Sequence, residues 1–232
     1  SHKAAAIAQD GAGIRVSTDG GDVTGDALLM AVGRRPNVAG LDLEKAGVEY
    51  SERGIAVNDH LQTSQPHIYA AGDCLGGYQF THYADWQARV AVRNLLLPGA
   101  SNGKRAWVPW TTFTEPEVAH AGLTEAEARD QHGDAVETVQ VALENVDRAL
   151  AEDDTRGFIK VVHKGGDVLG ATIVSGRAGE SIQAWIHVLD GNLKVRNLAS
   201  AIHVYPTYSR TNTWAAGQLL ESRIRGRLLG RV

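Results

Sequence analysis

Cysteine and methionine are scarce in this sequence. Among its 232 residues there is one cysteine, Cys74, and one methionine, Met30. A single cysteine excludes an intrachain disulfide and a metal site built from cysteines, and it fits a reducing compartment. We therefore expect a cytoplasmic protein.

Long apolar runs and strong net charge are absent too. No run approaches the roughly 20 residues that a membrane-spanning helix needs. The net charge of −4 gives no reason to expect nucleic acid or a membrane as a partner, and the nine histidines show no metal-ligand spacing, so we expect no metal site. The chain begins at Ser1 without Met or the apolar core of a signal peptide, so we expect further residues ahead of it.

The first hundred residues alternate short strands, turns and one helix. The Asp10–Gly11 turn predicts a hairpin, and continuous apolar runs are typical of strands buried on both faces. The strands that we expect are 4–8, 13–17, 27–32, 55–58 and 68–71, and the helices are 41–46 and 82–97.

Residues 99–105 are rich in Gly, Ser, Asn and basic side chains, and we expect a domain boundary there. Strands and helices after it are mixed, which predicts an α+β domain with a mostly antiparallel sheet flanked by helices. Its expected strands are 111–114, 138–143, 158–163 and 168–175, and its expected helices are 124–131, 178–190, 195–201 and 209–222.

The strongest site signal lies where the strand predicted at 68–71 ends. Gly72 and Asp73 follow it directly, and ligands of α/β sheets bind beyond the carboxyl ends of strands. An Asp there accepts hydrogen bonds from a hydroxyl group. The residues alone leave a second interpretation open, in which Asp73 only caps the next turn.

Several ordered motifs resemble the flavoprotein disulfide reductases, the family of lipoamide dehydrogenase, glutathione reductase and mercuric reductase. Thr63–Asp73 is similar to the second flavin motif of that family, and Ala31–Asn37 is similar to its Gly–Arg–x–Pro–Asn stretch. Gln79–His82 is similar to the loop that lies against the flavin, with Gln–Phe as in mercuric reductases. Phe113–Thr124 resembles the opening of the dimerisation domain. The resemblance covers nearly the whole chain.

This resemblance implies an architecture for the chain. Residues 1–37 would be the end of an NAD(P)-binding domain, 38–104 the second part of an FAD-binding domain, and 105–232 the dimerisation domain. A partial α/β FAD/NAD(P)-binding region would thus precede the α+β domain, and a homodimer would form through residues 106–232.

The resemblance also implies cofactors and site residues. Asp73 would bind the ribityl chain of FAD. The whole parent would pass a hydride from NAD(P)H to FAD, then electrons to a cysteine pair and on to substrate. The residues that we assign to cofactor binding are Gly33, Gly72, Asp73, Gln79, Phe80, Thr81 and His82.

One segment departs from the family pattern. Tyr205 stands where lipoamide dehydrogenase and glutathione reductase have their catalytic His, and Arg210 stands where they have Glu. A phenol with a pKa near 10 is a poor base at neutral pH, so ordinary lipoamide or glutathione reduction is not expected. Mercuric reductase is similar in having Tyr at this position. We name Tyr205 as the candidate catalytic residue, and an interface or packing role remains the alternative.

Other family parts do not occur in these residues. The last six residues, 227–232, lack the cysteine pair by which mercuric reductase passes on Hg(II), a metal that prefers thiolates. No Gly–x–Gly–x–x–Gly follows a strand, and no Cys–x4–Cys occurs. We expect a C-terminal part of a reductase that binds no cofactor and is inactive alone. The alternative is a stand-alone, non-catalytic dimerisation module.

Overall fold

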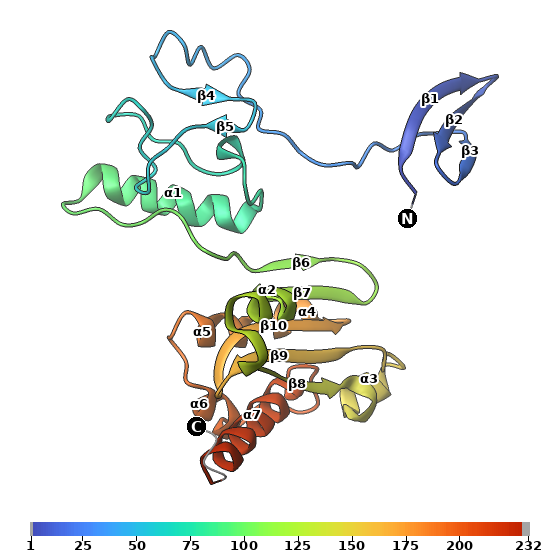
Figure 1. The fold of residues 1–232 in the computed structure, drawn as a ribbon, viewed down its shortest axis with the longest axis vertical. Helices are drawn as coiled ribbons and strands as arrows, with labels where there is room; N and C mark the ends of the chain where they lie inside the picture. Colours follow the sequence, from blue (N-terminus) through green and yellow to red (C-terminus); the bar gives the residue numbers. More distant parts are fainter. Residues whose placement is uncertain (1, 229–232) are drawn as a thin grey trace.

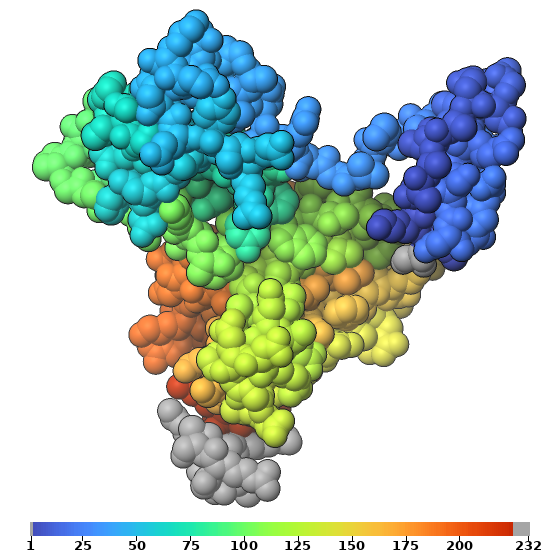
Figure 2. Space-filling model, turned by 45° about the horizontal axis from the view of Figure 1, so that its top comes forward, coloured from blue at the N-terminus to red at the C-terminus, as the bar shows by residue number. Residues whose placement is uncertain are grey.

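The computed structural model describes residues 2–228. The first of its parts is an antiparallel sheet of three strands in the order β1-β2-β3 (Figure 1). β1 (Ala4–Asp10) and β2 (Gly13–Thr18) form the hairpin that Asp10–Gly11 predicts, and β3 (Gly21–Gly25) follows a second turn. In the space-filling view this sheet forms a lobe of its own (Figure 2).

The strand predicted at 27–32 is wrong for this chain. These residues form no strand and are extended and exposed, with Leu29 at 87% and Val32 at 90% exposure. A strand buried on both faces needs neighbouring strands and covering helices, and none lies beside this segment in residues 2–228. The apolar run therefore forms an exposed, extended connection between the first sheet and the rest of the chain (Figure 1).

The second part is small and has little regular structure. It contains β4 (Tyr50–Ser51), β5 (Gly54–Ile55), the 3-10 turn η1 (Asp73–Leu75) and the helix α1 (Thr81–Leu96). Its core is a cluster of Leu43, Val48 and Ile55 with partly buried neighbours.

Two predictions in this part need correction. The helix expected at 41–46 is only a turn, in which a single amide, that of Ala46, reaches back four residues to Asp42 O. The strand expected at 68–71 makes one isolated bridge, between Gln62 and Tyr69. Both segments lack the partners that would extend a local turn or bridge into a regular element.

The third part contains a five-stranded antiparallel sheet in the order β6-β7-β10-β9-β8. The pairing of β9 with β10 is the predicted hairpin, and β10 lies at the centre of the sheet. The strands are β6 (Trp110–Thr112), β7 (Glu117–Gly122), β8 (Val136–Ala142), β9 (Phe158–Lys164) and β10 (Asp167–Ser175).

Helices cover both faces of this sheet. One face packs against α5, α6 and α7 around the fully buried Trp185, and the other packs against α2 through Ala128 and Val162. The helices and helical turns are α2 (Glu125–His132), η2 (Gly133–Ala135), η3 (Leu143–Asn145), α3 (Asp147–Ala151), α4 (Ala178–Ser181), α5 (Gln183–Leu189), α6 (Val195–Ser200) and α7 (Arg210–Leu228).

The predicted fold class is confirmed, because an antiparallel sheet flanked by helices follows the flavin-side residues. Thr124 caps α2 with a capping box that includes Glu127, as its sequence pattern favours. The helix expected at 178–190 is divided into α4 and α5 at Ile182. Our sequence analysis missed β7 and α3 in this domain, and β3 and β4 earlier in the chain.

A buried histidine makes the stability of this domain depend on pH. His163 in β9 is 1% exposed, and its Nδ1 has no hydrogen-bond partner. Burial lowers the pKa of His163, an effect that Glu137 across the strand pair partly offsets. The unfolded chain thus takes up this proton at a higher pH than the folded chain does.

We expect the free energy of unfolding to fall as the pH drops below about 6.5, the value for an unperturbed histidine. The slope from His163 reaches about 1.4 kcal/mol per pH unit between its unfolded and folded pKa values. Urea unfolding at several pH values measures it. His163→Gln should flatten the dependence, whereas the exposed His187 gives a control, His187→Gln, that should leave it unchanged. Equal pH profiles for the wild type and His163→Gln would contradict the assignment.

Within residues 2–228, no helix combines the length and apolar character that crossing a bilayer requires.

Candidate functional site

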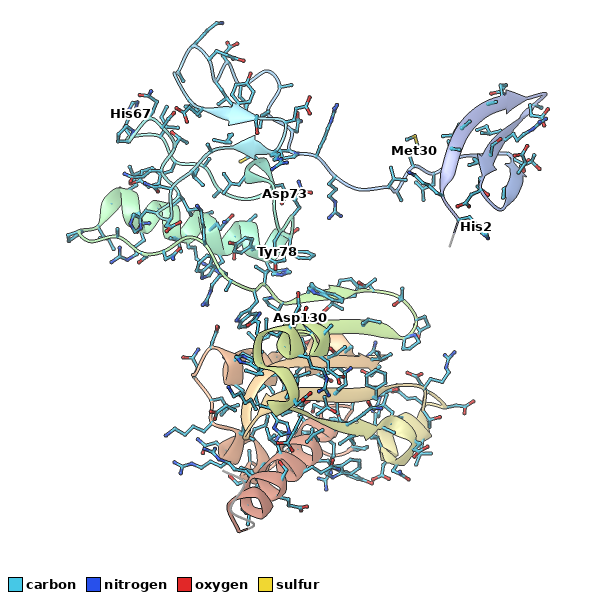
Figure 3. All side chains as sticks on the ribbon, in the orientation of Figure 1. His2, Met30, His67, Asp73, Tyr78 and Asp130 are labelled. Atoms are coloured by element: carbon cyan, nitrogen blue, oxygen red, sulfur yellow. The ribbon has the colours of Figure 1, made fainter. Side chains whose placement is uncertain are left out.

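The Gly72–Asp73 turn is held in a conformation that favours glycine. Gly72 has φ +82°, and a Cβ atom there would lie 2.8 Å from the Cβ of Ala84 in α1. This close approach to α1 fixes the residue type. Asp73 begins η1, and its side chain is exposed. Figure 3 shows Asp73 and Tyr78 on the segment between β5 and α1.

Gln87 in α1 anchors this turn from behind. Its side chain is 4% exposed; its Oε1 accepts the Gly72 N–H at 2.9 Å, and its Nε2 donates to Gly103 O at 3.1 Å. One amide side chain thus satisfies a buried donor and a buried acceptor from two loops. The turn that presents Asp73 is therefore fastened to the residues that follow α1.

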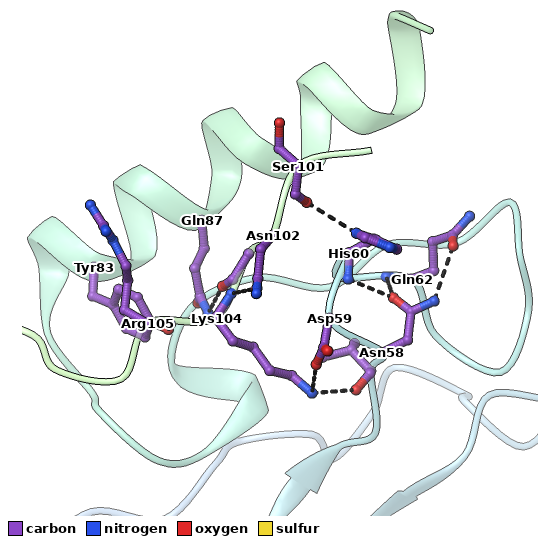
Figure 4. A network of polar contacts seen from close by, with 12 residues as sticks. Asn58, Asp59, His60, Gln62, Tyr83, Gln87, Ser101, Asn102, Lys104 and Arg105 are labelled. Atoms are coloured by element: carbon purple, nitrogen blue, oxygen red, sulfur yellow. Dashed lines mark hydrogen bonds and ion pairs between the residues drawn. The ribbon is translucent and has the colours of Figure 1, made fainter. Parts of the chain in front are cut away.

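A network of polar contacts extends this support (Figure 4). Lys104 Nζ donates to Val57 O at 3.1 Å and pairs with Asp59 Oδ1 at 3.1 Å. His60 Nδ1 bonds to Ser101 O at 3.2 Å. These contacts join the segment after α1 to the loop around residues 57–62.

The segment Gln79–His82, here named the flavin-facing loop after its predicted role, makes three connecting contacts. Arg34 Nη1 donates to Gln79 O at 3.2 Å, and Gln79 Nε2 donates to Asp73 O at 3.4 Å. His82 Nε2 donates to Pro109 O at 2.8 Å. The loop therefore touches the Gly33–Asn37 motif, the Asp73 turn and the start of the sheet domain.

A groove of about 750 Å³ runs along this loop. The flavin-facing loop forms one wall and the sheet domain the other. The aromatic side chains of Phe80, Trp110 and Phe113 and the polar ones of Arg34 and Glu117 all line it. Its size and mixed lining are typical of small-molecule sites.

The groove unites only some of the predicted residues. Gln79, Phe80, Thr81 and His82 line it together, but Gly33, Gly72 and Asp73 do not. Gly33 is adjacent in sequence to Arg34, and Asp73 is linked to the groove through Gln79.

Several groove residues were not assigned to the site by our sequence analysis, among them Arg34, Phe113 and Glu117. Arg34 lies inside the Gly33–Asn37 motif, and Phe113 and Glu117 lie inside the motif that opens the dimerisation domain, so a signal for them existed.

Tyr205, the candidate catalytic residue, lies on the loop before α7 and away from the groove lining. Its ring is 62% exposed. The guanidinium of Arg210 lies 6.0 Å from the centre of the Tyr205 ring and 5.9 Å from that of Trp214. A hydrogen bond to Asp147 raises the pKa of Tyr205, so the phenol stays protonated at neutral pH and acts as a donor rather than a base.

The neighbouring Tyr208 is buried, and its hydroxyl donates to Glu152 at 3.0 Å and to Asp154 at 3.3 Å. Burial, together with these carboxylates, raises its pKa. Tyr208 thus anchors the start of α7 to the segment after α3 and positions the exposed Tyr205 loop.

Two negative observations limit the chemistry of residues 2–228. No group of three His, Cys, Asp or Glu side chains gathers there in a form that could hold a metal ion. Cys74 is half-buried, burial raises the pKa of its thiol, and its Sγ donates to Ala71 O at 3.3 Å. A thiol with a raised pKa is a weak nucleophile.

The arrangement can bind a planar ligand with polar edges. Aromatic walls contact flat rings, while Gln79, Arg34 and the backbone of the loop offer hydrogen bonds. The exposed carboxylate of Asp73 lies on the neighbouring turn, where it can accept hydroxyl hydrogen bonds.

Comparison with known proteins finds two family models that match successive parts of this chain. Residues 1–88 match the model of the pyridine nucleotide-disulphide oxidoreductases, and residues 108–216 match the model of their dimerisation domain. A dihydrolipoyl dehydrogenase of Synechocystis is 38% identical over 79% of this chain and 41% of its own length. A mercuric reductase of Acidithiobacillus ferrooxidans is 38% identical over 83% of this chain and 35% of its own length. The chain thus spans less than half the length of these relatives.

Solved structures give the same result. LpdA from Mycobacterium tuberculosis superimposes with a TM-score of 0.84 at 32% identity, over 94% of this chain and 48% of that one. The flavoprotein disulfide reductase RclA from Escherichia coli, in its Cu(II) complex, gives a TM-score of 0.84 at 30% identity, over 93% of this chain and 50% of that one. From the two family models and these superpositions together, the chain belongs to the pyridine nucleotide-disulphide oxidoreductase family.

Proposed function

We propose that this chain is the C-terminal part of an FAD-dependent NAD(P)H disulfide oxidoreductase related to mercuric reductase. It supplies one wall of the flavin site and the homodimer interface, and it is inactive alone. The observation that carries this proposal is the groove between the flavin-facing loop and the sheet domain, where four of the predicted cofactor residues meet. Residues 1–37, 38–104 and 105–232 are then the NAD(P)-side, FAD-side and dimerisation segments.

The residues present fit one side of an FAD molecule. Asp73 offers a carboxylate to the hydroxyl groups of the ribityl chain, since it is exposed beside a glycine turn. Gln79–His82 would border the flavin ring along the groove. When bound, FAD supplies the acceptor for a hydride from NAD(P)H. The chain has no glycine-rich phosphate cradle, so its residues alone cannot hold FAD tightly.

Exposed apolar side chains support the proposal that another part of the parent packs against this chain. Residues 27–32 have the composition of a buried strand, yet they lie in solvent. On α1, Val92, Leu95 and Leu96 are 54%, 57% and 71% exposed. Contiguous apolar surface of this kind marks an interaction face, and the relatives have more than half of their length beyond this match. The remaining part of the parent would cover these residues.

Tyr205 has the chemistry of a donor in substrate handling. Its raised pKa keeps the phenol protonated, and the neighbouring Arg210 cation lies over its ring. A protonated phenol does not supply the base that thiol exchange needs. In the homodimer, Tyr205 would reach toward the flavin of the other subunit.

The experiment compares this chain with the complete parent, expressed from the full gene. We expect the purified 232-residue chain to be colourless and to bind FAD too weakly to retain it through gel filtration, because the pyrophosphate site is missing. The complete parent should be yellow, with one FAD per subunit, and should oxidise NAD(P)H. Absorbance at the flavin band measures both. Equimolar FAD in the short chain would overturn the proposal, and a colourless complete parent would favour a non-catalytic dimerisation module.

A further inference from the structure

Arg105 lies in the segment between α1 and β6 and contacts both sides of that boundary. Its guanidinium carbon is 5.2 Å from the ring centre of Trp86 in α1, and its Nη2 is 3.3 Å from Asp190 Oδ1, directly after α5. A planar guanidinium can stack on an aromatic ring and pair with a carboxylate at once. One side chain therefore joins the flavin-side helix to the sheet domain.

The backbone of Arg105 makes a third contact with the same helix. Its N–H donates to the Tyr83 hydroxyl at 3.2 Å, and the Tyr83 ring stacks on Trp86 with centres 5.8 Å apart and planes at 11°. Figure 4 shows Arg105 beside Tyr83. Both aromatic residues lie in the first two turns of α1, immediately after the flavin-facing loop.

A cleft of about 220 Å³ at this boundary has Arg105, Trp86 and Asp190 among its lining residues. Its lining also includes His82 and Pro109, whose hydrogen bond is the other direct tie between the loop and the sheet domain. His82 and Ile186 line both this cleft and the larger groove. The cleft and the groove therefore share part of their lining.

We propose that Arg105 is a positioning residue that holds the flavin-facing loop against the dimerisation domain and so sets the width of the cofactor groove. The expected effect of Arg105 on catalysis rests on the proposed function, whereas its expected effect on the position of the loop does not. Arg105 contacts neither cofactor nor substrate. It acts through Trp86 and Asp190.

The test uses the complete parent with FAD bound and three variants. Arg105→Ala removes both contacts, and Arg105→Lys keeps the charge for Asp190 but loses the planar stack on Trp86. Arg89→Ala is the matched control. Arg89 lies on α1 and lines the same cleft as Arg105, but it pairs with the exposed Asp85 at 2.9 Å rather than with the sheet domain. Hydrogen exchange of residues 79–82, the rate of flavin reduction by NAD(P)H and the flavin absorption spectrum are measured for each.

We expect Arg105→Ala to speed the exchange of the loop amides about tenfold, since an ion pair and a cation–π contact at a part-exposed site together change an equilibrium by that factor. The rate of flavin reduction should fall about tenfold because misplaced groups lose catalytic orientation. The flavin spectrum should shift while FAD content stays constant. Arg105→Lys should lie between the wild type and Arg105→Ala, and Arg89→Ala should match the wild type.

The inference would be overturned if the amides of residues 79–82 exchanged no faster in Arg105→Ala than in Arg89→Ala, whatever the activity of either variant. Faster exchange with an unchanged rate of flavin reduction and an unchanged spectrum would also overturn it, because the groove would then not depend on Arg105. Should the complete parent bind no FAD, the proposed function fails, and the exchange experiment on the same protein still decides whether Arg105 holds the loop. If Arg105→Ala does not fold, Arg105→Lys alone supports the inference by faster exchange or overturns it by wild-type exchange.

Discussion

Replacing Ile202 and Val204 together by aspartate should turn the proposed homodimer of the complete parent into a monomer. Both side chains are exposed in this chain, at 103% and 76%, on the loop that leads to Tyr205. An apolar side chain that a partner buries contributes about 1.5 to 3 kcal/mol, and twofold symmetry counts each substitution twice. The dissociation constant should therefore rise by roughly a thousandfold or more.

Analytical ultracentrifugation over a dilution series measures this change. Ile7→Asp is the control, since Ile7 is 50% exposed on β1, far along the chain from the dimerisation domain. It should leave the dimer intact. A double variant that remains dimeric at the same concentrations as the wild type would mean that the Tyr205 loop lies outside the interface, and the position of Tyr205 next to a second subunit would fall with it.

Asp73→Ala in the complete parent should weaken FAD binding by about 10- to 100-fold. A hydrogen bond to a charged group contributes about 1.5 to 3 kcal/mol, and each 1.4 kcal/mol is about a tenfold change in affinity. The exposed carboxylate of Asp73 sits on a turn that Gln87 fixes from behind, so its loss should remove a contact without unfolding the turn. Titration of the apoprotein with FAD, followed by flavin fluorescence, gives the dissociation constant.

The control for this experiment is Asp85→Ala, which removes an exposed carboxylate from α1 that pairs with Arg89. A surface ion pair of this kind contributes at most about 1 kcal/mol to stability, and FAD affinity should not change. Asp73→Asn should give an intermediate loss, because an amide still accepts a hydrogen bond but without charge. Wild-type affinity in Asp73→Ala would exclude its carboxylate from the FAD site, and its side chain makes no cap hydrogen bond in the turn.

The Tyr205 segment differs in residue type from the His–Glu pair that the family resemblance leads one to expect in a dithiol reductase. A His–Glu pair would give a base near neutral pH, whereas here a phenol with a raised pKa is stacked against an arginine. Its relatives include both dihydrolipoyl dehydrogenases and mercuric reductases, so family membership alone leaves the acceptor open. The raised pKa of Tyr205 shows only that its phenol is protonated at neutral pH and so is not a base for thiol exchange.

Sequence patterns were sufficient wherever a few neighbouring residues decide the structure. The Asp10–Gly11 hairpin, the capping box of α2 and the β9–β10 hairpin all depend on local turn and cap chemistry. Patterns were misleading at 27–32 and 68–71, where burial on both faces was inferred from composition. A strand of that kind is stable only beside other strands, and no strand of residues 2–228 flanks either segment in a regular ladder.

By itself, the sequence determined the family and the α+β domain, because ordered motifs and turn signals are local and survive in any part of the chain. Only the tertiary structure decided that Gln79–His82 face Phe113 and Glu117 across one groove, and that Tyr205 lies apart from it. It alone also placed Arg105 between Trp86 and Asp190. These contacts join residues far apart in sequence, and their distances follow from how the helices and the sheet pack rather than from any spacing along the chain.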